Sequence, residues 1–170
     1  MKQIYLDVDG VINAMSSKPP TQNTGWTGDW DKRTINQFEI LWSLELVTAL
    51  NDLAARDDVQ IKWLTTWQDD APYILSPEIG INGVDWPFFT TDDEGLRDMI
   101  DWWKLDAIRN DIDKTQPEKV VWLDDDIRFD GNTRNWLAEN TGLVLAISPN
   151  SYHGLGRKHI EQITAFLDEE

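Results

Sequence analysis

Acidic side chains follow two of the most apolar short runs in the sequence. Asp7 lies near the end of the run QIYLDV and Asp9 follows that run directly, and the acidic triplet 124–126 follows the run KVVWL. Carboxylates held in one small crevice repel one another unless a cation lies among them. Oxygen ligands without Cys or clustered His favour magnesium over zinc. This arrangement suits phosphoryl transfer, in which a metal ion and a lysine neutralise phosphate oxygens while an in-line nucleophile attacks.

The acidic residues must be positioned by strands that end at the same edge of a sheet. Short apolar runs bounded by turn residues predict five strands, over 3–8, 59–64, 84–89, 119–123 and 143–147. Thr65 and Thr66 follow the second of these runs directly. In parallel sheets ligands collect at the carboxyl ends of the strands, so these hydroxyl groups are expected beside the aspartates.

Helical spacing of apolar residues separates the predicted strands. We expect helices over 43–56, 69–75, 95–110 and 157–167, with Ser43 in front of the first and Lys104 on the third. Strands alternating with helices indicate the α/β class, with right-handed crossovers. The predicted fold is therefore a three-layer sandwich, a mainly parallel five-stranded sheet with helices on both faces.

One segment departs from this alternation. Residues 14–38 are rich in Ser, Lys, Pro, Thr and Gly and include Pro19-Pro20, a composition that disfavours regular helix there. We expect a loop or small hairpin that covers the active site as a minimal cap. At 170 residues the chain is expected to form one domain over 1–170, with a small cap insertion at about 14–38.

Composition restricts the class of protein. Fifteen basic and 31 acidic side chains give a net charge of −16, a field that disfavours extended tracking along nucleic acid. No apolar run is long enough for a membrane span, and nothing resembles a signal peptide. Cysteine is absent, which fits a reducing compartment. We expect a cytoplasmic protein.

Ten tryptophans are many for this length. Most lie among apolar neighbours and are expected in the core, namely Trp42, Trp63, Trp102, Trp103, Trp122 and Trp136. Trp26, Trp30 and Trp67 lie in polar context, where an aromatic ring can flank a ligand or stack on a base. We expect His153 and His159 to have ordinary turn and surface roles. The segment 151–158 follows the last strand and could contact substrate.

Four motifs in order resemble those of the haloacid dehalogenase (HAD) superfamily. They are DVDGV, the strand 59–64 ending in Thr, the lone Lys104, and VVWLDDD, and together they span residues 4–126. The resemblance implies a HAD-like Rossmannoid fold. It also implies that Asp7 attacks phosphorus to give an aspartyl-phosphate, and that Asp9 protonates the leaving group and then activates water.

The same resemblance implies roles for the remaining motif residues. The hydroxyl after the second strand would bind the phosphoryl group, a role open to Thr65 or Thr66, and Lys104 would hold the phosphate and screen Asp7. Asp125 would be the direct magnesium ligand, with Asp124 holding a metal-bound water or orienting Lys104.

Around this centre we expect Asp7 and Asp9 to complete the magnesium site, and Gly10, Thr66 and Trp67 to contact substrate. The role of Asp126 is open, with capping of a helix N-terminus the favoured interpretation.

More narrowly, DVDGVIN, WLTTW, VVWLDDD and a late GLG resemble the HAD domain of "Swiss army knife" RNA-repair proteins. This implies a magnesium-dependent phosphomonoesterase acting on nucleotides or nucleic-acid ends. The net charge of −16 favours the alternative of a small phosphorylated metabolite. A third alternative, from another class, is a catalytically silent binding module. The sequence does not indicate an oligomeric state.

Overall fold

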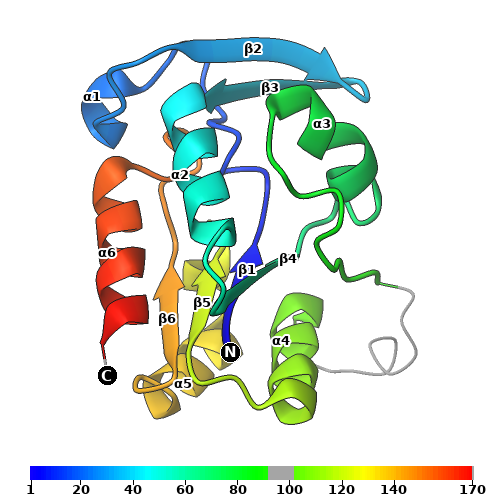
Figure 1. Cartoon of the computed structure of the whole chain (residues 1–170), viewed down its shortest axis with the longest axis vertical. Helices are drawn as coiled ribbons and strands as arrows, with labels where there is room; N and C mark the ends of the chain where they lie inside the picture. Colours follow the sequence, from blue (N-terminus) through cyan, green and yellow to red (C-terminus); the bar gives the residue numbers. More distant parts are fainter. Residues whose placement is uncertain (92–101, 170) are drawn as a thin grey trace.

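A four-stranded parallel sheet lies at the centre of the computed structural model, which describes residues 1–91 and 102–169 (Figure 1). Its order is β4 (Val59–Trp63), β1 (Lys2–Leu6), β5 (Val120–Leu123) and β6 (Val144–Ile147). Alternate residues of each strand point to opposite faces, so Ile4 and Leu6 belong to one apolar cluster and Tyr5 to the other. The α/β class and the parallel sheet are confirmed.

The prediction of a fifth strand over 84–89 is wrong. This run meets the edge of β4 through a single bridge between Trp63 and Phe88. The N–H of Trp63 donates to the carbonyl of Pro87 over 2.8 Å, and the N–H of Phe89 donates to the carbonyl of Trp63 over 3.2 Å. Pro87 has no N–H to donate, so the ladder does not extend along the run.

Helices cover both faces of the sheet, which makes three layers. Helices α2 (Leu44–Ala54) and α6 (Arg157–Asp168) pack on the face that carries Ile4 and Leu6. Helices α4 (Trp103–Thr115) and α5 (Gly131–Glu139) pack on the opposite face. Short helical turns fill the connections: α1 (Thr21–Thr24), the π-helical turn η1 (Ala71–Leu75), α3 (Ser76–Ile79) and the 3-10 turn η2 (Ile127–Phe129).

The predicted helices agree with the structure to different degrees. Ser43 caps α2 by accepting a hydrogen bond from the N–H of Leu46, and α6 begins at Arg157 as expected. The helix expected over 95–110 is α4, which begins at Trp103 and continues to Thr115, and residues 95–101 of the prediction lie outside the described residues. The short helix expected over 69–75 is η1, continued by α3.

The segment 14–38 leads into a hairpin that crosses the carboxyl ends of the strands (Figure 1). Strand β2 (Trp30–Ile35) pairs antiparallel with β3 (Phe38–Ser43) through a two-residue turn in which Asn36 and Gln37 both have positive φ. The second strand thus extends five residues beyond the predicted limit of residue 38. No helix among the described residues has the length and apolarity that a membrane crossing requires.

Candidate active site

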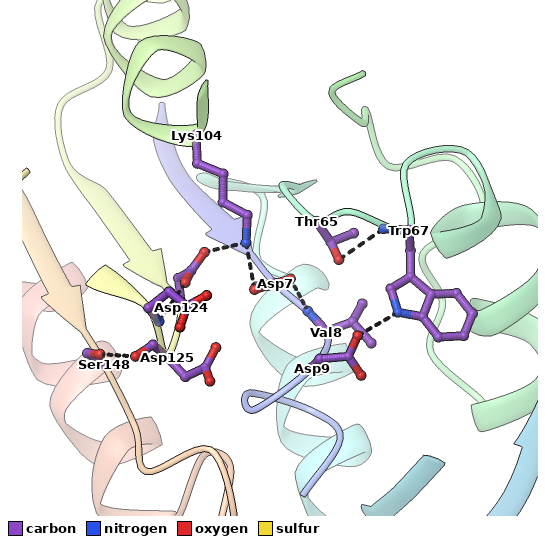
Figure 2. A network of polar contacts seen from close by, with 10 residues as sticks. Asp7, Val8, Asp9, Thr65, Trp67, Lys104, Asp124, Asp125 and Ser148 are labelled. Atoms are coloured by element: carbon purple, nitrogen blue, oxygen red, sulfur yellow. Dashed lines mark hydrogen bonds and ion pairs between the residues drawn. The ribbon is translucent and has the colours of Figure 1, made fainter. Parts of the chain in front are cut away.

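Lys104 joins two aspartates from neighbouring strand ends (Figure 2). Its Nζ lies 2.6 Å from Oδ2 of Asp7, which follows β1, and 2.6 Å from Oδ2 of Asp124, which follows β5. The other oxygen of Asp7 accepts from the N–H of Val8, and that of Asp124 accepts from the N–H of Asp126. All three charged side chains are buried. Lys104 comes from α4, so the structure brings together the first and fourth motifs and the lone lysine as expected.

Burial and mutual repulsion perturb the ionisation of this group. Burial raises the pKa of Asp7 above its ordinary value, against the opposing effect of Lys104. Burial and then the charge of Asp7 raise the pKa of Asp124 to about 7. Burial would lower the pKa of Lys104, but the two carboxylates more than offset it and raise that pKa. The lysine therefore remains protonated, and its positive charge partly offsets the effect of burial on the two carboxylates.

Asp125 supplies a third carboxylate to the same crevice. Ligand oxygens of Asp7, Asp124 and Asp125 lie within 4.8 Å of one another. Burial, and then the neighbouring charges of Asp126 and Asp7, raise the pKa of Asp125 to about 6. The hydroxyl of Ser148, after β6, donates to the backbone carbonyl of Asp125 over 2.8 Å and fixes the loop.

Gly10 makes room for the Asp125 carboxylate. Its φ is +70°, and a Cβ at this position would lie 2.3 Å from Oδ2 of Asp125. Any side chain here would therefore overlap the acidic cluster. The glycine of the DVDG motif shapes the site sterically, and its expected contact with substrate stays a prediction.

Asp9 is turned away from the three clustered carboxylates, toward Trp67 (Figure 2). Its Oδ2 accepts from the indole Nε1 of Trp67 over 2.9 Å, and its Oδ1 accepts from Nδ2 of Asn13 over 2.8 Å. The carboxylate of Asp9 is not among the clustered ligand oxygens, and its expected place in the metal site stays a prediction.

The two threonines after β4 differ in environment. Thr65 is buried, and its hydroxyl accepts from the N–H of Trp67 over 3.3 Å and counts among the groups that lower the pKa of Asp7. Thr66 is exposed. The contact with Asp7 favours Thr65 over Thr66 for the phosphate-binding role that the sequence left open.

A pocket of about 550 Å³ opens between Asp9 and the hairpin. Residues from the loop after β1 and from both hairpin strands line it, among them Met15, Lys32, Phe38 and Glu39. Met15 and Phe38 are exposed, and Lys32 forms an ion pair with Glu39 over 2.7 Å. The segment expected to cover the site thus lines a cavity on the Asp9 side of the carboxylate cluster.

The carboxylate cluster fits a hard divalent cation. Its donors are all oxygen, the ligand type that Mg²⁺ and Ca²⁺ prefer. Burial, and then the neighbouring negative charges, raise the pKa values of Asp124 and Asp125, and the positive charge of a bound cation would oppose both effects.

The sequence matches the family model described as the HAD domain in Swiss Army Knife RNA repair proteins, over residues 3–160. The chain belongs to this family. Membership supports a phosphatase-type hydrolase that uses a metal ion, and it agrees with a sheet whose carboxyl ends carry Asp7, Thr65 and Asp124. No curated protein and no solved structure gives a significant match.

Other residues singled out in the sequence lie away from this centre. Trp26 is buried and its indole donates to the carbonyl of Leu155 over 2.7 Å, so it belongs to the core. Trp30 packs against the core from β2. His159 accepts from the N–H of Gly156 at the start of α6, and Asp126 precedes η2 without a side-chain capping bond, contrary to the favoured interpretation.

Asn13, which contacts both Asp9 and the hairpin, was not among the predicted site residues. Its importance depends on the conformation of the loop after β1, where the N–H of Asn13 donates to the carbonyl of Val8 over 2.9 Å. A polar residue four positions after Asp9 was the available signal, and many loop asparagines share it.

Proposed function

We propose that this HAD-family chain is a Mg²⁺-dependent phosphomonoester hydrolase that works through an aspartyl-phosphate on Asp7. The observation that carries the proposal is the position of Lys104, whose Nζ lies 2.6 Å from carboxylate oxygens of both Asp7 and Asp124. A buried ammonium group beside a buried carboxylate neutralises part of the repulsion between that nucleophile and an incoming phosphate.

In the first half-reaction an oxygen of Asp7 attacks phosphorus. The new P–O bond forms as the ester P–O bond breaks in line with it, and Asp9 gives its proton to the departing oxygen. The alcohol leaves through the pocket that Asp9 lines. Lys104 and the hydroxyl of Thr65 hold the phosphoryl oxygens during the transfer.

In the second half-reaction Asp9, now a carboxylate, takes a proton from water as the water oxygen attacks phosphorus. The bond between phosphorus and the Asp7 oxygen breaks and inorganic phosphate is released. Asp7 is again a carboxylate and Asp9 is again protonated, so the cycle closes without any other reactant than water.

Asp7, Asp124 and Asp125 are the residues that would hold Mg²⁺. When bound, the ion supplies positive charge that stabilises the negative charge on the phosphoryl oxygens in the transition state. Asp124 also fixes Lys104, which agrees with the orienting role expected of it.

Nucleotides or nucleic-acid ends are the proposed substrates. The family description and the pocket beside Asp9 support this class, because exposed Phe38 offers a surface on which a base can stack and Lys32 offers a positive charge. The net charge of −16 supports the second candidate, a small phosphorylated metabolite that presents a single phosphate rather than a polyanion.

The first test is hydrolysis of an aryl phosphate with and without Mg²⁺, for the wild type and for Asp7→Asn. We expect Mg²⁺-dependent turnover that Asp7→Asn abolishes. Asp126→Asn is the matched control, because Asp126 is an exposed acid beside the cluster. It should retain turnover. A wild type that neither hydrolyses the ester nor binds Mg²⁺ by calorimetry would instead identify a silent binding module.

The second test compares a phosphorylated oligonucleotide with a mononucleotide across a range of salt concentrations. Because the protein is strongly acidic, salt should first improve oligonucleotide turnover by screening long-range repulsion. Mononucleotide turnover without oligonucleotide turnover at any salt concentration would restrict the proposed substrates to nucleotides, and turnover of neither would support the small-metabolite candidate.

A further inference from the structure

We infer that Trp67 and Asn13 are positioning residues that hold the carboxyl group of Asp9 and connect it to the β2–β3 hairpin. This inference rests on the proposed function, in which Asp9 transfers the proton. It assigns Trp67 a different task from the substrate contact that its sequence context suggested.

The hydrogen bonds to Asp9 fix its carboxyl group from both sides. An indole N–H and a side-chain amide N–H can only donate, and each lies on a different oxygen of Asp9, at 2.9 and 2.8 Å. The plane of the carboxyl group is therefore set by Trp67 and Asn13 together. Trp67 is 8% exposed and Asn13 is 5% exposed, so both side chains are held by their surroundings.

Each of these residues also contacts the hairpin. The Oδ1 of Asn13 accepts from the backbone N–H of Leu41 in β3 over 2.9 Å. The ring of Trp67 lies 5.4 Å from that of Phe38, the first residue of β3, at an angle of 58°. Phe38 also lines the pocket beside Asp9. A leaving group that displaces the Phe38 ring therefore acts on the neighbouring ring of Trp67, which positions the carboxyl group of Asp9.

The orientation of the proton donor affects the rate more for some substrates than for others. A leaving group of low pKa departs as an anion with little need of a proton, whereas an alkoxide departs poorly without one. A misoriented Asp9 therefore slows hydrolysis of an alkyl phosphate more than hydrolysis of a nitrophenyl phosphate. A purely structural defect slows both alike, so the ratio of the two kcat/KM values isolates the positioning role.

The variant is Trp67→Phe, which keeps an aromatic ring against Phe38 and removes the N–H. Trp30→Phe is the matched control, because the indole N–H of Trp30, in β2 of the hairpin, is buried and has no hydrogen-bond partner among the described residues. We expect Trp67→Phe to lower kcat/KM for the alkyl ester about 10- to 100-fold, a part of the usual 10²–10⁴ contribution of a general acid, and that for the nitrophenyl ester less than about threefold. Equal losses on the two esters, or no loss, would overturn the inference.

A second readout does not depend on turnover. In a ¹⁵N spectrum the indole N–H signal of Trp67, assigned from its loss in Trp67→Phe, should shift in Asp9→Ala more than the other nine indole signals. An unmoved signal refutes the contact. A moved signal in a protein that hydrolyses neither ester would refute the proposed function while the contact between Trp67 and Asp9 stands.

Discussion

Replacing Gly10 by alanine places a methyl group where the carboxylate of Asp125 lies. The new Cβ would be 2.3 Å from Oδ2, 2.4 Å from Cγ and 2.9 Å from Cβ of Asp125. Since even the Cβ atom is too close, rotation of the Asp125 side chain does not relieve the overlap. The loop after β5 must move, and the third carboxylate leaves the cluster.

Two effects of different size follow from Gly10→Ala. The positive φ of +70° costs an alanine about 1–2 kcal/mol, which lowers the melting temperature of a chain this long by about 2–8 °C. Displacement of Asp125 should weaken Mg²⁺ binding at least about tenfold, or about 1.4 kcal/mol. Calorimetric titration with Mg²⁺ measures the second effect, and a thermal melt of the metal-free protein measures the first.

Gly80→Ala separates the two effects. Gly80 has a φ of +83°, but a Cβ there would meet nothing nearer than Cγ1 of Val47 at 3.9 Å. It should therefore lower the melting temperature by a similar amount and leave Mg²⁺ affinity unchanged. Unaltered Mg²⁺ affinity in a folded Gly10→Ala protein would refute the assignment of Asp125 as a ligand.

Three further outcomes are expected. Thr65→Val should lower kcat for an aryl phosphate at least about tenfold, whereas Thr66→Val should stay within about threefold, since only Thr65 is buried beside Asp7; equal losses would contradict this. Buried Lys62, in β4, forms an ion pair with the half-buried carboxylate of Asp111, in α4; Lys62→Met leaves that carboxylate without its cation and should cost about 2–4 kcal/mol in urea denaturation, with partial recovery in the double variant Lys62→Met/Asp111→Asn. The pKa of Asp124 in the folded protein, about 7, lies above its unfolded value of 3.8, so metal-free stability falls as pH rises from about 4 to about 7. Mg²⁺ binds the deprotonated form, and its stabilising effect in a thermal melt should therefore be larger at about pH 8 than at about pH 5.5.

Sequence patterns predicted the parts of the site that depend on strand ends. Apolar runs identify β1, β4 and β5, and parallel pairing then brings Asp7, Thr65 and Asp124 to one edge without further information. Lys104 was expected on a helix, and its side chain reaches that edge from α4.

Other features depend on contacts that periodicity does not encode. Helix α5 was missed because, of its described residues, Thr133 alone is buried, and its start depends on Asp130, whose side chain accepts from the N–H of Thr133. The hydrogen bond from Trp67 to Asp9 spans 58 residues and requires the turn after β4, where Gln68 has a φ of +50°. Side-chain partners set by loop conformation leave no regular trace in a sequence.

The position of β1 in the middle of the sheet has a consequence for how the protein is made. Leu6 pairs with Trp63 on one side and with Leu123 on the other, so β1 is made before both of its neighbours and gains the second of them late. Such distant pairings are slow to form. A nascent chain that ends before β5 can pair β1 with β4 and pack α2 on them, but it exposes the free edge of β1. The acidic cluster therefore assembles only after β5 has been made, because Asp124 and Asp125 reach Asp7 only when that edge is closed.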